Sequence, residues 1–99
     1  MPRVLLTPPA KASLASIRAY LSEQSDSAWP ALSRKLRAAY LLLAEFPGAG
    51  FERPEWAHRH VRFFVVDVYV IVYDSASKPL RVLNVVHSAQ DVGRVLRRR

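Results

Sequence analysis

The longest hydrophobic stretch of the chain spans residues 62–73. Its twelve residues, RFFVVDVYVIVY, include ten apolar or aromatic side chains and neither glycine nor proline. β-Branched and aromatic side chains at this density favour strands over helices, where they would lose rotamer freedom. The only break is at Asp67-Val68, and aspartate tolerates the positive φ that a hairpin turn requires. The stretch therefore predicts strands over 61–66 and 69–74, joined by a two-residue turn or a longer, bulged loop.

Two shorter apolar runs predict further strands. Residues 80–86 follow a turn signal at 75–79, and we expect this third strand to pair antiparallel to the second. Near the N-terminus, residues 3–6 are short and apolar. They predict an edge strand, which ends where Pro8 and Pro9 would interrupt ladder pairing.

The segment between these strands predicts two amphipathic helices. Thr7 is a suitable N-cap for the first helix, with Pro8 at the first helical position. Its apolar residues recur at helical spacing: Ala10, Leu14, Ile17 and Leu21. The second helix should begin at Asp26 or Ser27, because Pro30 is tolerated only in a first turn. Its apolar stripe comprises Trp29, Leu32, Leu36, Ala39, Leu43 and Phe46. The short connector predicts an antiparallel helical hairpin.

The order of these elements predicts an α+β fold. It consists of an N-terminal edge strand, a two-helix hairpin and a three-stranded antiparallel meander packed on that hairpin. Residues 92–96 predict a short C-terminal helical turn. Ninety-nine residues form one core but not two, so we expect a single domain over 1–99. Helices on one side would leave the other face and an edge of the sheet open to a partner.

Composition narrows the class of protein. The chain is 51% hydrophobic and 23% charged, which is typical of a globular protein. It has no cysteine, which excludes disulfides and thiolate zinc sites and is compatible with a reducing compartment. The N-terminus lacks the pattern of a signal peptide, and no window approaches the roughly 18 apolar residues of a membrane span. We expect a soluble, cytoplasmic protein without a membrane partner.

The net charge of +7 is concentrated in the second half of the chain. From residue 59 onward there are eight basic residues against three acidic ones. This imbalance favours an anionic partner, such as nucleic acid, an acidic protein or a membrane surface. The candidate target-binding or nucleic-acid-binding residues are Arg59, Arg62, Arg81, Arg97, Arg98 and Arg99. The last three are equally compatible with a solvated tail.

Three phrases along the chain resemble a known family. They are F-P-x-x-G at 46–50, R-x-F-x-V-x-x-Y-x-I-x-Y at 62–73 and V-x-H-x-x-x-D at 85–91. Together with the order of strands and helices, they resemble the ParE/RelE superfamily of bacterial toxins. The likeness covers nearly the whole chain and is greatest to the ParE, or plasmid stabilisation, branch.

The resemblance implies a small bacterial toxin without a cofactor. A cognate acidic, ParD-like antitoxin would hold it inactive. Members of the ParE branch are associated with inhibition of DNA gyrase, and members of the RelE branch with cleavage of messenger RNA on the ribosome. We expect gyrase inhibition by protein contact. The alternatives are a RelE-like endoribonuclease and a degenerate, non-toxic relative.

The nuclease alternative can be stated in chemical terms. Metal-independent RNA cleavage needs a base, an acid and cations that hold the phosphate. Arg62 and Arg81 are candidates for the cations, and His87 for proton exchange near neutral pH. RelE-like enzymes place an arginine near the position of Arg62 and a histidine or tyrosine near the end of the last strand. This chain departs from that pattern, since Ser88 follows His87 and the loop before the sheet lacks lysine.

Each candidate also has a structural interpretation. His87 would bond a backbone carbonyl or Asp91, and Arg62 would lie outward with its stem on apolar neighbours. Tyr69 and Tyr73 lie four apart on a strand, which places them on one face and favours core packing. The H-x-H pair at 58–60 has no evident third ligand, so we expect no metal site.

Overall fold

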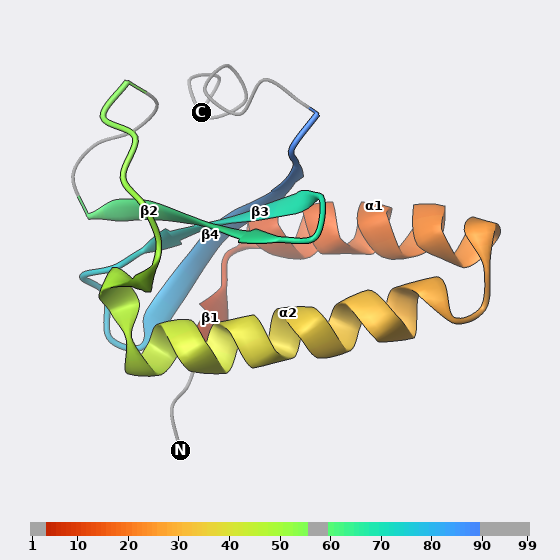
Figure 1. Ribbon diagram of the computed structural model, residues 1–99, viewed down its shortest axis with the longest axis horizontal. Helices are drawn as coiled ribbons and strands as arrows, with labels where there is room; N and C mark the ends of the chain where they lie inside the picture. Colours follow the sequence, from red (N-terminus) through yellow and green to blue (C-terminus); the bar gives the residue numbers. More distant parts are fainter. Residues whose placement is uncertain (1–3, 56–59, 90–99) are drawn as a thin grey trace.

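The computed structural model of the protein describes residues 4–55 and 60–89 (Figure 1). Two helices pack on one face of a four-stranded sheet, as the α+β prediction requires. In chain order the elements are β1 (Val4–Leu6), α1 (Pro8–Gln24), α2 (Ala28–Glu45), the 3₁₀ turn η1 (Pro47–Ala49), β2 (Val61–Val66), β3 (Tyr69–Asp74) and β4 (Leu80–His87). The helical turn expected at 92–96 lies outside the described residues.

Helix α1 begins at the predicted cap. The Thr7 hydroxyl oxygen accepts a hydrogen bond from the Ala10 N–H at 3.4 Å, and Pro8 occupies the first helical position. The same hydroxyl lies 3.0 Å from the carbonyl oxygen of Val82 and 2.9 Å from that of Leu83. Thr7 therefore caps α1 and fastens its start to β4. The predicted apolar face is confirmed: Ala10 is buried, and Leu14, Ile17 and Leu21 pack against the core.

Helix α2 places most of its predicted stripe in the core. Leu32, Leu36, Ala39 and Leu43 are buried, and Trp29 packs beside them. The prediction for Phe46 is wrong, because its side chain is 55% exposed. The helix ends at Glu45, so Phe46 has left the helical period that would have directed it inward.

The β2–β3 hairpin is the shorter of the two predicted alternatives. Val66 pairs with Tyr69, so only Asp67 and Val68 form the turn. Asp67 adopts φ 55°, the left-handed conformation that a tight hairpin requires. Its carboxylate also accepts two hydrogen bonds from the Lys35 ammonium, at 3.0 and 3.1 Å, which link the hairpin tip to α2.

The sheet order is β1-β4-β3-β2. The predicted antiparallel meander of β2, β3 and β4 is confirmed, but the sheet is mixed, because β1 pairs parallel to β4. The meander was predicted from local turn signals, which carry no information about a partner more than 70 residues away. The β3–β4 register also shifts: Val82 lies opposite Tyr73 and Asn84 opposite Val72. Leu83 is therefore the extra residue of a bulge.

The expectation of an open second sheet face is wrong. On the face opposite the helices, Phe63 and Val72 are fully buried, and Val70 and Val86 are each 5% exposed. Phe51 belongs to the same cluster and pairs with Phe63 in an isolated bridge, with ring centroids 5.8 Å apart. The loop after α2 thus runs beside the edge of β2 and adds the Phe51 side chain to this face. Within 4–55 and 60–89, no helix combines the length and apolarity needed to cross a bilayer.

Candidate functional site

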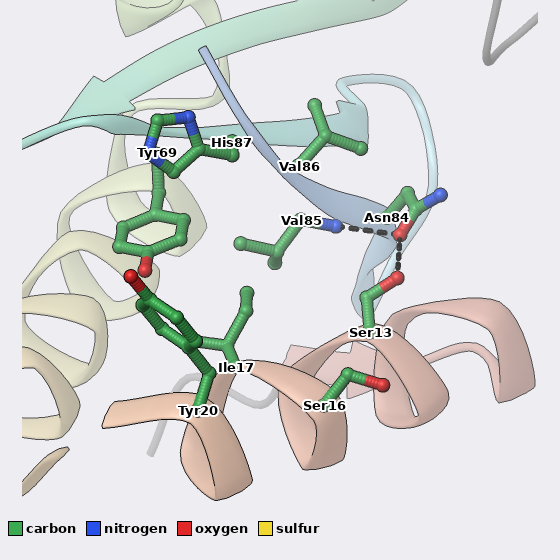
Figure 2. Close-up of a pocket in the computed structure, with 9 residues that line it drawn as sticks. All are labelled: Ser13, Ser16, Ile17, Tyr20, Tyr69, Asn84, Val85, Val86 and His87. Atoms are coloured by element: carbon green, nitrogen blue, oxygen red, sulfur yellow. Dashed lines mark hydrogen bonds between the residues drawn. The ribbon is translucent and has the colours of Figure 1, made fainter. Parts of the chain in front are cut away.

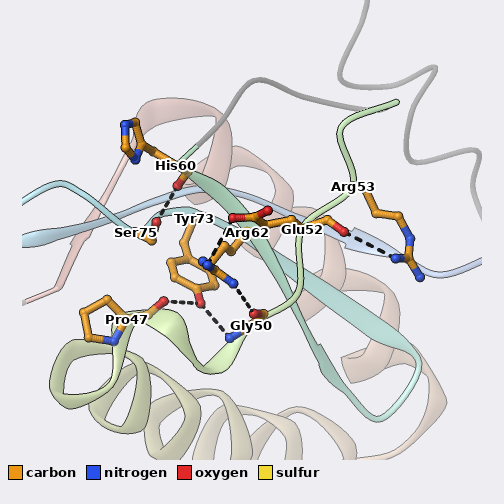
Figure 3. Close-up of polar contacts among 8 residues, drawn as sticks. All are labelled: Pro47, Gly50, Glu52, Arg53, His60, Arg62, Tyr73 and Ser75. Atoms are coloured by element: carbon orange, nitrogen blue, oxygen red, sulfur yellow. Dashed lines mark hydrogen bonds and ion pairs between the residues drawn. The ribbon is translucent and has the colours of Figure 1, made fainter.

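The segment after α2 is held against the sheet by one buried phenol (Figure 3). The Tyr73 hydroxyl donates to the Pro47 carbonyl oxygen at 2.6 Å and accepts from the Gly50 N–H at 2.9 Å. A Cβ atom on Gly50 would lie 2.5 Å from the Tyr73 oxygen and 2.7 Å from the Phe63 carbonyl oxygen. Burial raises the pKa of Tyr73, while the Gly50 N–H and the Arg62 charge oppose that rise. A side chain at position 50 would collide with this phenol and with the Phe63 backbone, which explains why glycine stands there.

Arg62 belongs to the same contact network. Its Nη1 donates to the Gly50 carbonyl oxygen at 2.8 Å, and its Nη2 lies 3.1 Å from a carboxylate oxygen of Glu52 (Figure 3). The Arg62 side chain is 27% exposed, so it is not the outward-facing arginine of the structural interpretation. Two of its nitrogen atoms are engaged in fastening the loop to β2.

Arg81 lies near the same end of the sheet but on the other face. Arg62 is opposite Tyr73 on β3, and Arg81 is opposite the next β3 residue, Asp74. Leu80 and Val82, on either side of Arg81, belong to the core beneath the helices. Successive side chains of a strand alternate between faces, so the exposed Arg81 points away from the helices. Phe64 and Val66 alternate with Arg62 in the helix-side core, which places Arg62 on the helix side.

His87 lies at the opposite end of the sheet. It pairs with Tyr69, four residues along β3 from the partner of Arg62, a separation of roughly 13 Å along the strand alone. Its Nδ1 accepts a hydrogen bond from the Ala89 N–H at 2.9 Å, and its ring meets that of Tyr69 edge-on at 5.3 Å. The predicted partners were a backbone carbonyl or Asp91; the described bond comes from a backbone N–H, and Asp91 lies outside the described residues. The structure does not bring Arg62, Arg81 and His87 together.

A groove of about 500 Å³ lies beside His87, between α1 and the end of β4 (Figure 2). Its lining comprises Ser13, Ser16, Ile17, Tyr20, Tyr69, Asn84, Val85, Val86 and His87. Ser13 donates its hydroxyl hydrogen to the Asn84 side-chain oxygen at 2.6 Å. Burial raises the pKa of Tyr69, and the neighbouring Tyr20 phenol adds to the rise. The predicted core packing of Tyr69 and Tyr73 is confirmed, since both are buried beneath the helices.

The family model described as ParE toxin of type II toxin-antitoxin system, parDE, matches residues 4–92. The chain belongs to the ParE toxin family. It is therefore the toxin component of a type II toxin-antitoxin system, a class in which the toxin is paired with an antitoxin. No curated protein matched the chain.

The structure of this ParE toxin gives the motifs physical roles. In F-P-x-x-G, the proline carbonyl and the glycine N–H bond Tyr73, which is the last residue of the second motif. The first residue of that second motif, Arg62, bonds the same glycine. Residues of the first two motifs therefore form one contact network, and their hydrogen bonds hold the loop after α2 against the sheet.

Sequence reasoning missed the polar lining of the groove in this ParE toxin. Ser13, Ser16 and Tyr20 recur at spacings of three and four, a polar line beside the apolar face of α1. This spacing is the sequence feature from which the polar wall of the groove could have been predicted. Among the candidates, Arg59, Arg97, Arg98 and Arg99 lie outside the described residues, as do His58 and Asp91. Across 4–55 and 60–89, no cluster of histidine and acidic side chains is suited to a metal ion.

Proposed function

We propose that this ParE toxin inhibits DNA gyrase by protein contact, without chemistry of its own, in the bacterial cytoplasm. The observation that supports this most directly is the separation of Arg62, Arg81 and His87. RNA cleavage needs an acid, a base and cations within hydrogen-bond reach of one phosphodiester. Arg62 is engaged with Gly50 and Glu52, Arg81 lies on the other face, and His87 lies at the far end of the sheet.

We further propose that the antitoxin is acidic. The toxin carries a net charge of +7, and complementary charge accelerates association and disfavours incorrect partners. Among the basic candidates, we assign target contact to the exposed Arg81 and to Arg59, Arg97, Arg98 and Arg99. An Arg81→Glu variant should lose gyrase inhibition while keeping its unfolding midpoint, because the side chain is at the surface.

A supercoiling assay tests the proposed target. Purified toxin is incubated with gyrase, ATP and relaxed plasmid, and the products are separated on gels that resolve supercoiled, relaxed and linear DNA. Loss of supercoiling or accumulation of cleaved DNA is the expected result. Intact supercoiling together with specific cuts in messenger RNA would replace gyrase by the endoribonuclease alternative. Absence of both effects, and of toxicity on expression, would identify a degenerate relative.

Two histidine variants distinguish inhibition by protein contact from catalysis. His87→Ala removes the only candidate for proton exchange among the three groups considered above, and His60→Ala changes another exposed histidine as the matched control. If the toxin acts by contact, both variants should arrest growth as the parent chain does. Selective loss of toxicity in His87→Ala, with unchanged stability, would contradict the proposal.

A further inference from the structure

Helix α2 carries a line of exposed side chains along the side that faces away from the core. Each member lies two residues after one of the buried α2 residues, which is slightly more than half a turn of the helix. All members are exposed, and Leu41 is 51% exposed. We call this line the outer stripe of α2; it comprises Arg34, Ala38, Leu41 and Glu45.

The two charges of the outer stripe have no opposite charge nearby on their own helix. Arg34 and Glu45 lie roughly 16 Å apart along the axis, which is too far for an ion pair between them. No acidic residue stands three or four positions from Arg34, and no basic residue stands three or four positions from Glu45. Neither forms an ion pair within residues 4–55 and 60–89. Within this part of the chain, both charges are therefore available to a partner.

The outer stripe is complementary to itself when its direction is reversed. If a second copy of α2 lies antiparallel, centred between residues 39 and 40, Arg34 meets Glu45 of that copy and Ala38 meets its Leu41. Two-fold symmetry repeats both contacts, so an ion pair at each end flanks two leucine–alanine contacts. A small side chain opposite a large one lets the two helices approach closely. A single exposed leucine is ordinary on a protein surface, but here every residue of the stripe faces a complementary one.

We infer that two copies of this toxin associate by antiparallel packing of their α2 helices along the outer stripe. Residues at spacings of four, three and four are typical of the contact face of helices that pack in this way. Glu45 disfavours a nucleic acid or an anionic membrane at the same place, because its carboxylate would repel their phosphates. No α2 residue lines the groove beside His87, so this surface is separate from that groove and does not depend on the proposed gyrase target. The contact spans about three helical turns, so the dimer should be weak, with Kd between about 10 μM and 1 mM.

An exchange of charges tests the contact. Arg34→Glu places two carboxylates opposite each other across the dimer, and Glu45→Arg places two guanidinium groups there, so each variant should raise the dimer Kd about tenfold or more. The first substitution lowers the net charge and the second raises it, so general repulsion between copies cannot explain weaker association in both. The double variant restores opposite charges and should return Kd to within about threefold of the parent value. Because the two positions cannot meet within one chain, only contact between two chains can produce this restoration.

Sedimentation velocity of the purified toxin, from about 1 μM to about 1 mM, measures the equilibrium between monomer and dimer. Arg18→Glu is the matched control, since it makes the same change of charge at an exposed residue of α1 and should change Kd by less than about threefold. Circular dichroism verifies that each variant is folded. A parent chain that stays monomeric over the whole range would overturn the inference and leave the outer stripe to a different protein. A dimer whose Kd is unchanged by the single substitutions, or is not restored in the double variant, would overturn the outer stripe as the contact.

Discussion

Removal of the Tyr73 hydroxyl should destabilise the protein strongly while leaving its shape almost unchanged. Tyr73→Phe deletes one oxygen that accepts from the Gly50 N–H and donates to the Pro47 carbonyl. The side chain is fully buried, and the bond to Gly50 is buried as well. Water therefore cannot replace the lost partner without entering the core.

The magnitude follows from these two orphaned backbone groups. A buried donor or acceptor left without a partner costs about 1–3 kcal/mol, and the Pro47 carbonyl is only partly buried. We expect a loss of about 2–4 kcal/mol in the free energy of unfolding. For a domain of this size, each 1 kcal/mol lowers Tm by about 4–8 °C, so the loss corresponds to roughly 8–32 °C.

Urea unfolding followed by far-UV circular dichroism measures this loss, with the m-value checked for constancy. Tyr40→Phe is the matched control, since the Tyr40 hydroxyl is buried without a hydrogen-bond partner among the described residues. Deleting an unsatisfied hydroxyl should be neutral or slightly stabilising. The reasoning is refuted if Tyr73→Phe costs less than about 0.5 kcal/mol, or if both variants lose the same amount.

Three further predictions use the same unfolding assay. Gly50→Ala should cost about 1–3 kcal/mol, because its Cβ meets the Tyr73 oxygen and the Phe63 backbone, whereas Gly48→Ala meets nothing within 4 Å and should cost almost nothing; equal effects would contradict the steric account. Arg62→Met should lower the free energy of unfolding by about 1 kcal/mol, mainly through loss of the hydrogen bond to the Gly50 carbonyl. If this loss vanishes in high salt, the stabilisation comes instead from the ion pair with the exposed Glu52. Burial raises the pKa of Tyr40 to about 12, so the folded state holds this proton more tightly than the unfolded state does. Stability should be complete below about pH 10 and fall between about pH 10 and 12, by at most about 1.4 kcal/mol per pH unit, and Tyr40→Phe should flatten that fall.

Local patterns predicted the elements well. The spacing of Ala10 and Leu14 in α1, and the density of β-branched residues in β3, are properties of neighbouring residues, and the structure confirms both. The parallel pairing of β1 with β4 was not predictable in this way, since it joins segments whose partner choice depends on the whole fold. The burial of Phe46 was predicted wrongly because the end of a helix is harder to locate from sequence than its middle.

The candidate site was less predictable than the fold. Arg62 and His87 were identified by residue type, but type does not reveal which strand face or which end of the sheet a side chain occupies. The bonds that engage Arg62 come from Gly50 and Glu52, which lie about ten residues away in a loop without regular structure. Likewise, the groove joins α1 residues such as Ser13 to β4 residues such as His87, which become neighbours only after the helix has packed on the sheet.

The pairing of β1 with β4 has a consequence for synthesis in the cell. The ribosome produces β1 first, yet its hydrogen-bonding partner Leu80–Val82 is made more than 70 residues later. Nascent chains fold from their N-terminal end as they emerge, at about 5–20 residues per second, and long-range pairings close slowly. A growing chain of this toxin therefore lacks its finished sheet for several seconds. Until the final strand docks, the sheet is incomplete, so any surface that includes β4 exists only on finished molecules.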